Sequence, residues 1–213
     1  MLKETGFILM PFSISHPFFY RLLFSSILLV YSLSVTAKPN NAQLLSACPI
    51  SSSFDFPVGA PDAKGYYNAQ KFGNNKHLGD DWNGNGGGNT DFGDTVYASS
   101  DGIVSFSKNI KGGWGNVVRI YHNYGTKLKP IYIESLYAHL NKRLVKKGDI
   151  VTKGTKIGTI GNAGGIYWAH LHFEIRDTLD MPIGQGYSNN THGYLDPTKF
   201  IRAHRKINKS TLK

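Results

Sequence analysis

The sequence predicts one all-β domain, and three observations support this fold class. Glycine, tyrosine and phenylalanine are abundant, with 24, 12 and 12 copies in 213 residues, a composition typical of strands joined by tight turns. From Phe54 onward, short runs of β-branched and aromatic residues alternate with turns rich in Gly, Asn and Asp. No stretch shows a sustained apolar period of 3.6 residues, so we expect few and short helices.

Five segments are predicted to be strands: Gly102–Phe106, Asn116–His122, Ile131–Leu140, Lys156–Ile160 and His170–Arg176. In the last segment two histidines alternate with apolar residues, a period of two that is typical of a half-buried strand. The apolar residues should face a core, with His170 and His172 about 6–7 Å apart on the opposite face. This pair is either half of a zinc site or a coincidence on a surface strand.

The first residues are predicted to be a secretory signal. Leu22–Leu33 is an uncharged apolar run that follows Arg21 and is too short to span a bilayer comfortably. The small residues Val35–Ala37 suit signal peptidase, so we expect removal of residues 1–37 and export to the periplasm or the extracellular cell wall. An uncleaved membrane anchor is the alternative interpretation.

The remaining chain is predicted to comprise a short linker at 38–53, the domain at 54–201 and a basic tail at 202–213. Leu45–Cys48 resembles a lipoprotein processing box, but it does not directly follow the apolar run, which disfavours lipidation of Cys48. This residue is the only cysteine, so an internal disulfide is excluded.

The chain carries a net charge of +10, which favours an anionic partner, and nucleic acid, bacterial wall polymers and membrane surfaces are all anionic. The signal sequence and the lack of a recognition-helix motif disfavour nucleic acid.

A second half of a metal site is predicted around the turn from His77 to Trp82. It holds a histidine and two adjacent carboxylates, Asp80 and Asp81, and composition does not choose between them. A hydrolytic zinc site needs three protein ligands of this nitrogen and oxygen type, with one position left for water. The alternative is a plain polar turn. His139 ends another predicted strand, and no other catalytic motif is present, so a histidine is the expected acid–base group.

These motifs, in this order, resemble the lysostaphin-like (LytM-type) zinc metallopeptidases. The resemblance covers roughly Phe54 to Ile201 and rests on these segments: His77-x-Gly79-x-Asp81, Val96–Ala98, Asp101–Val104, Gly115–Val118, Tyr137–Leu140, Val145–Asp149 and His170–Glu174. It implies a flattened antiparallel β-roll or sandwich with long groove-forming loops. It also implies an exported endopeptidase that acts on the peptide stems or cross-bridges of bacterial peptidoglycan.

The resemblance further implies one zinc ion bound by His77, Asp81 and His172, with His139 and His170 assisting the zinc-activated water. Which of these two histidines is the general base stays open. The family also uses a tyrosine near the oxyanion, for which the candidates are Tyr66 and Tyr67.

Two long loops, residues 82–89 and 180–194, should wall the substrate groove. His122 is expected to be a turn residue rather than a ligand. The expected partner is peptidoglycan peptide, with no nucleic acid and no membrane span after processing, for a chain that we expect to be a monomer.

Whether D-Ala–diaminopimelate cross-links or glycine bridges are cleaved stays open. Two alternatives remain: a metal-free regulator or binding module of the same fold, and a carrier domain, which the hairpin at 145–161 resembles.

Overall fold

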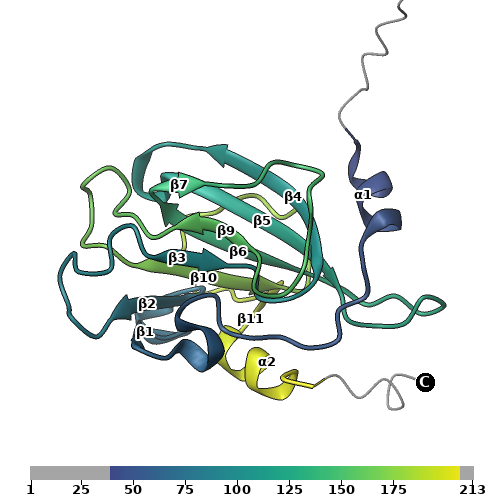
Figure 1. The fold of residues 1–213 in the computed structure, drawn as a ribbon, viewed down its shortest axis with the longest axis horizontal. Coiled ribbons are helices and arrows are strands. Elements are labelled where there is room, and N and C mark those ends of the chain that lie inside the picture. The colour runs from purple at the N-terminus through teal and green to yellow at the C-terminus, as the bar shows by residue number, and fades with distance from the viewer. Residues whose placement is uncertain (1–38, 207–213) are drawn as a thin grey trace, which may run out of the picture. The chain divides into compact units, whose positions relative to one another are not determined.

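The structure, a computed structural model, describes residues 39–206, which form two antiparallel β-sheets and two short α-helices (Figure 1). The expected signal peptide and the last residues of the basic tail lie outside the described residues. The strands are β1 (Tyr66–Gln70), β2 (Asp80–Gly84), β3 (Thr95–Tyr97), β4 (Gly102–Asn109), β5 (Asn116–Asn123), β6 (Tyr132–Leu140), β7 (Lys142–Arg143), β8 (Ile150–Val151), β9 (Lys156–Thr159), β10 (Leu171–Arg176) and β11 (Tyr194–Leu195). The helices are α1 (Asn41–Ala47) and α2 (Pro197–Ala203), with short helical turns at η1 (Gly59–Ala63), η2 (Asn74–Lys76) and η3 (Gly112–Trp114).

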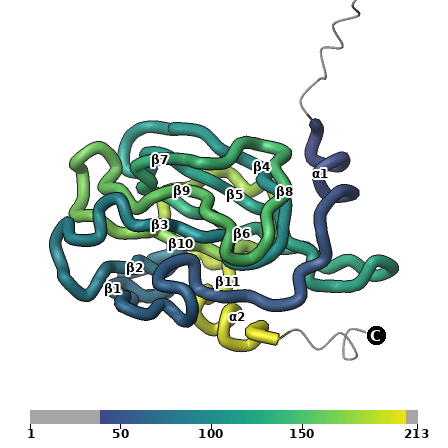
Figure 2. The backbone as a smooth tube through the Cα atoms, in the orientation of Figure 1, coloured from purple at the N-terminus to yellow at the C-terminus, as the bar shows by residue number. Residues whose placement is uncertain are grey.

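The larger sheet has the order β1-β2-β10-β6-β5-β4-β8, with β11 added beside β10, and the smaller sheet has the order β3-β9-β7. One apolar cluster joins the two sheets, because Val96 of β3 and Ile157 of β9 pack with Val104, Ile120 and Phe173 of the larger sheet. The path of the chain through both sheets can be followed in Figure 2. The prediction of an all-β antiparallel sandwich with few short helices is confirmed.

All five predicted strands are present, with ends that differ by one to three residues from those expected. The other strands are not predicted, because they are too short or too polar to show a strand pattern in the sequence. Strand β2, for example, reads Asp-Asp-Trp-Asn-Gly, and its extended form is set by pairing with β1 and β10 rather than by local propensity.

Strand β10 differs from its prediction, because it is buried on both faces rather than half-buried. Leu171, Phe173 and Ile175 lie in the main core, as expected. The opposite face carries His172, Glu174 and Arg176, which are 3%, 0% and 0% exposed. The segment after the strand covers this face, and backbone carbonyls of Pro182 and Ile183 accept hydrogen bonds from the Arg176 guanidinium. Burial of these charged groups is tolerated because each of them is paired.

The segment expected to be a linker contributes to the fold. Asn40 and Gln43 form a capping box at the start of α1, and Leu44 packs with Ile103 and Tyr121 of the larger sheet. The Cys48 thiol, 3.3 Å from the Tyr121 carbonyl oxygen, is also buried, and burial raises its pKa to about 11. The Cys48 thiol is therefore packed inside the fold in the described part of the chain.

The start of the expected basic tail is also packed. Asp196 caps α2, whose Phe200 and Ile201 enter the core. Beyond the helix, the Arg205 guanidinium binds the carboxylates of Asp55 and Asp62.

His122 is not a turn residue, since it lies within β5 and is fully buried. Its Nδ1 lies 2.8 Å from the Asp101 carbonyl oxygen, which can only accept, so Nδ1 carries the proton. Its Nε2 lies 2.7 Å from the Ser135 hydroxyl, which in turn hydrogen-bonds the Tyr137 hydroxyl at 3.0 Å. Burial lowers the pKa of His122 to about 4, so the ring stays neutral inside the folded protein.

We expect this histidine to make the fold acid-sensitive. The unfolded chain binds a proton at His122 near pH 6.5 but the folded chain does so only near pH 4, so stability falls as pH drops through this window. The pKa difference corresponds to about 3 kcal/mol of unfolding free energy. Urea unfolding of wild type and His122→Gln at pH 7, 6, 5 and 4 measures the effect. Equal pH dependence in the two proteins would contradict this account.

Candidate metal centre

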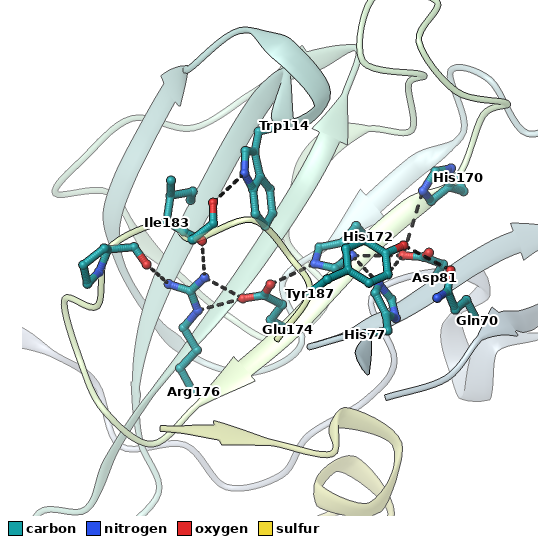
Figure 3. Close-up of polar contacts among 12 residues, drawn as sticks. Gln70, His77, Asp81, Trp114, His170, His172, Glu174, Arg176, Ile183 and Tyr187 are labelled. Carbon is teal, nitrogen blue, oxygen red and sulfur yellow. Dashed lines mark hydrogen bonds and ion pairs between the residues drawn. The ribbon is translucent and has the colours of Figure 1, made fainter. Parts of the chain in front are cut away.

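Three side chains, His77, Asp81 and His172, bring one donor atom each to a common point (Figure 3). His77 Nε2 lies 3.0 Å from His172 Nδ1 and 3.3 Å from Asp81 Oδ1, and the latter two atoms are 2.9 Å apart. Asp81 and His172 face each other because they are register partners in the pairing of β2 with β10. All three side chains are buried.

A glycine lets the turn that carries His77 approach this strand pair. A Cβ on Gly79 would lie 2.5 Å from the Phe173 carbonyl oxygen and 3.0 Å from His172 Cε1. Both contacts are with β10, so any larger residue would push the turn away from β10 and separate the donor atoms.

The two adjacent aspartates have different partners, because neighbouring residues of a strand point to opposite faces. Asp80 accepts hydrogen bonds from the Phe72 amide and from the Thr198 hydroxyl, so it anchors α2 to β2. Asp81 points to the histidines.

Burial alone would raise the pKa of Asp81, but hydrogen bonds from His172 and His77 hold it well below its usual value. Burial would likewise lower the pKa of His172, but its bonds to Asp81 and Glu174 raise it to about 9.

The donor set fits a zinc ion. Two imidazole nitrogens and one carboxylate oxygen are ligand types that zinc accepts, and three protein ligands leave a fourth position open. Ligand atoms of a tetrahedral zinc lie about 3.4 Å apart, close to the 2.9–3.3 Å separations among the three donors.

The other ring nitrogen of His172 is held by a buried carboxylate. Its Nε2 lies 2.9 Å from Glu174 Oε1, which directs the proton to Nε2 and leaves Nδ1 as the free lone pair in the neutral ring. The second carboxylate oxygen of Glu174 accepts hydrogen bonds from Nε and Nη2 of Arg176, at 2.7 and 2.6 Å. A chain of paired charges therefore orients one donor of the candidate centre (Figure 3).

We expect Glu174→Gln to weaken zinc binding by about 10–100-fold. The glutamine amide can still hydrogen-bond the His172 imidazole, but it lacks the negative charge of the Glu174 carboxylate. The matched control is Glu134→Gln, which also loses a fully buried carboxylate paired with an arginine, Arg119, but does not contact the donors. Both variants should lose folding stability, and only the first should release zinc more readily to a chelator. Equal zinc affinities in the two variants would contradict this role.

Two further imidazoles lie beside the three donors. The ring of His139 is 4.7 Å from the ring of His170 and 5.6 Å from that of His172. His170 Nε2 lies 3.9 Å from Asp81 Oδ1, and its Nδ1 lies 2.8 Å from the Trp168 carbonyl oxygen. Because a carbonyl only accepts, Nδ1 carries a proton and the neutral His170 keeps its lone pair on Nε2.

His139 has an unusual backbone and a buried ring. Its φ of 60° lies in the left-handed region, which is sparsely populated by residues other than glycine and occurs often at functional sites. Burial, with His172 and His170 nearby, holds the pKa of His139 well below its usual value. The ring is therefore neutral at neutral pH.

The centre opens into two cavities that share Gln70, Asp81, Tyr167 and His170. The first, here the Tyr187 arm, has a volume of about 610 Å³ and is also lined by Trp114, His139 and residues 184–187. The second, here the Trp168 arm, has a volume of about 700 Å³ and is also lined by Asn83, Asn89 and residues 165–168. The two loops expected to wall a groove therefore lie along it.

The tyrosines at the centre are not the expected ones. The Tyr66 hydroxyl donates to Asp94 at 2.6 Å, and Tyr67 lines neither arm. Instead Tyr187 packs against the His77 ring at 5.1 Å and donates to Gln70 Oε1 at 3.2 Å. Its position in an irregular loop gave no periodic signal for prediction.

Trp114, Glu174 and Arg176 also surround the candidate centre, although no sequence motif predicts a role for them. Trp114 packs edge-on against His172 at 5.3 Å and donates to the Gly184 carbonyl oxygen. It therefore joins η3 to the segment that follows β10. Glu174 and Arg176 follow His172 at intervals of two, and this shared strand face was the signal that could have found them.

The chain is similar in sequence to proteins that are named as endopeptidases or carboxypeptidases. Over 92 residues the chain is 41% identical to the peptidoglycan DD-endopeptidase ShyA of Vibrio cholerae, covering 40% of this chain and 19% of ShyA. Over 84 residues it is 42% identical to the DD-carboxypeptidase/endopeptidase Mpg of Neisseria meningitidis, covering 39% of this chain and 17% of Mpg. The chain thus spans less than a fifth of the length of these two relatives.

A solved structure of the SpoIIQ–SpoIIIAH pore-forming complex aligns with a TM-score of 0.52 at 20% identity, covering 73% of this chain and 94% of that chain. This likeness shows a shared fold. The family model for peptidase family M23 matches residues 77–190, more than half of the sequence, and this range includes the three donors and both neighbouring imidazoles, His77, Asp81, His139, His170 and His172. The chain belongs to peptidase family M23.

Proposed function

We propose that the protein is an exported, zinc-dependent endopeptidase that hydrolyses peptide bonds in the peptide stems or cross-bridges of bacterial peptidoglycan. The observation that carries the proposal is the convergence of His77 Nε2, Asp81 Oδ1 and His172 Nδ1 within 3.3 Å of one another. Membership of a peptidase family supports peptide-bond hydrolysis, and the names of the relatives support wall peptides as the substrate.

In this proposal His77, Asp81 and His172 hold one zinc ion. Zinc there would lower the pKa of a water molecule and polarise the scissile carbonyl. Asp81 supplies the one negative charge among the three ligands. Glu174 and Arg176 keep the imidazole of His172 turned so that its Nδ1 faces the other donors.

His170 and His139 move protons and stabilise charge. His170 Nε2 accepts the proton of the attacking water, because its Nδ1–H is fixed on the Trp168 carbonyl oxygen. As the water oxygen bonds to the carbonyl carbon, His139 hydrogen-bonds the carbonyl oxygen, on which negative charge develops. When the C–N bond breaks, His170 passes its proton to the leaving amine. The position of His170 at the junction of the two arms, with the His139 ring 4.7 Å from it in the Tyr187 arm, supports this division of roles.

The names of ShyA and Mpg favour D,D peptide bonds as the bonds that are cleaved. Both are described as DD-endopeptidases or DD-carboxypeptidase/endopeptidases, so we propose D,D cross-links rather than glycine bridges as the substrate of this chain.

Export rests on the signal predicted at residues 1–37, which lies outside the described part of the chain. Among residues 39–206, no helix has the length and hydropathy that crossing a membrane requires. The burial of Cys48 supports a protein that is not lipidated at this residue.

The alternative is a metal-free regulator or binding module of the same fold, and metal content separates the two. We expect one zinc per chain after repletion of the purified protein, measured by elemental analysis. Less than one zinc per chain would favour the module and contradict the enzyme.

A further inference from the structure

A third cavity, here the Lys111 arm, adjoins the Trp168 arm. This cavity has a volume of about 460 Å³ and shares Asn162 and Ile166 with the Trp168 arm. A ligand long enough to occupy both cavities would lie beside His170 and Trp168 at one end and beside Lys111 at the other. The two segments of this path have different chemistry.

The Trp168 arm is neutral beyond the candidate centre. Apart from Asp81 and His170, its lining within residues 39–206 is uncharged, and amides dominate its polar part. Asn89 Oδ1 accepts from the Ala169 amide, Asn83 Nδ2 donates to the Ala169 carbonyl oxygen, and Asn162 Oδ1 accepts from the Gly165 amide. The remaining Asn83 Oδ1, Asn89 Nδ2 and Asn162 Nδ2 have no partner in the described chain, which leaves one acceptor and two donors for a ligand.

Trp168 is exposed beside these amides. It is 70% exposed, although its backbone is fixed, because its carbonyl oxygen holds His170 and the next residue is bonded to Asn83 and Asn89. An exposed indole on a rigid support gains apolar contact when a ligand covers it. An uncharged, extended peptide segment suits this arm, whereas a carboxylate would lose its hydration without gaining a counter-charge.

The Lys111 arm has the opposite character. Lys111 lines it, no acidic residue within 39–206 does, and the ammonium group forms no ion pair there. A second cation, Arg143, donates to Asn116, which also lines this arm. Lys111 adopts a left-handed φ of 62° just before η3. This arm therefore suits a carboxylate.

We propose that this path binds the donor stem peptide, with its neutral terminal residue beside His170 and Trp168 and a carboxylate of a preceding residue at Lys111. The proposal rests on the proposed function and adds the direction in which the substrate lies. A stem peptide carries an uncharged D-alanine next to the cross-link and carboxylates on the residues before it. The order of charge along the peptide thus matches the order of charge along the groove.

The test uses two synthetic cross-linked peptides that differ in the donor stem, one with free carboxylates and one with these groups amidated. For Lys111→Met we expect KM for the free-carboxylate peptide to rise about fivefold with kcat unchanged, and no change for the amidated peptide. The preference of wild type for the free-carboxylate peptide should shrink in high salt, because the ion pair between Lys111 and the carboxylate is exposed to solvent. Lys108→Met, which removes a nearby cation outside the groove, is the matched control and should behave as wild type.

Trp168→Ala should raise KM about tenfold for both peptides, because the neutral segment is common to them. An unchanged KM for Lys111→Met, or an equal change for both peptides, would overturn the proposal. If wild type hydrolyses neither peptide, the proposed function is contradicted. The position of the peptide in the groove is then tested by a binding measurement alone. Tryptophan fluorescence titration should then still show about fivefold tighter binding of the free-carboxylate peptide to wild type than to Lys111→Met, and equal binding would overturn the proposal.

Discussion

Replacing His172 with alanine is expected to abolish hydrolysis, with kcat/KM lower by at least about 10³-fold, because a bound zinc ion lowers the pKa of a water molecule toward neutrality. His172 supplies one of three donors, and its removal also leaves the buried Glu174 without a partner on one oxygen. The measurement is release of muropeptides from purified sacculi, together with the zinc content of each protein.

The matched control for this variant is His192→Ala. His192 lies in the exposed loop before β11 and contacts none of the donors, so its removal should leave zinc content and release unchanged. A thermal melt of each variant separates loss of zinc from loss of fold. Equal muropeptide release by His172→Ala and wild type would contradict the metal assignment.

Replacing His139 or His170 with alanine should separate catalysis from metal binding. Neither residue is among the three converging donors, so both variants should keep one zinc per chain. Each should lose about 10²–10⁴-fold in kcat, because general acid–base catalysis contributes this much. KM should change little. The measurement is steady-state hydrolysis of a soluble cross-linked peptide at matched zinc content.

The pair of variants also tests the division of roles. If His170 accepts the proton, His170→Ala should lose the solvent deuterium isotope effect on kcat, whereas His139→Ala should keep this effect at a lower rate. A variant that loses zinc along with activity would instead be a ligand, and that result would contradict the assignment for its histidine.

The strands with local periodicity could be predicted from sequence, and those defined by their partners could not. Strand β10 alternates clearly, and β5 and β6 are rich in β-branched and aromatic residues. Strand β2 carries Asp-Asp-Trp-Asn-Gly, and only its pairing with β10 makes it extended and places Asp81 opposite His172. This pairing is also why composition could not choose between the two aspartates.

The residues that converge could be anticipated by type, but their surroundings could not. A charged strand face in sequence suggests contact with water, so Glu174 and Arg176 gave no hint of burial. They are buried because residues 177–187 fold back over them, and this segment has no regular pattern. Helix α1 is different, since its capping pair Asn40 and Gln43 is itself a sequence signal for the start of a helix.

The most direct test of the central claim is mass spectrometry of products formed from one purified dimeric muropeptide with a D-Ala–diaminopimelate cross-link. The zinc-repleted wild-type protein should convert the dimer to two monomers whose summed mass exceeds that of the dimer by one water. Chelation of zinc should stop the conversion, and added zinc should restore it. A dimer that stays intact with the repleted protein, or one that is cleaved equally after chelation, would contradict a zinc-dependent peptidoglycan endopeptidase.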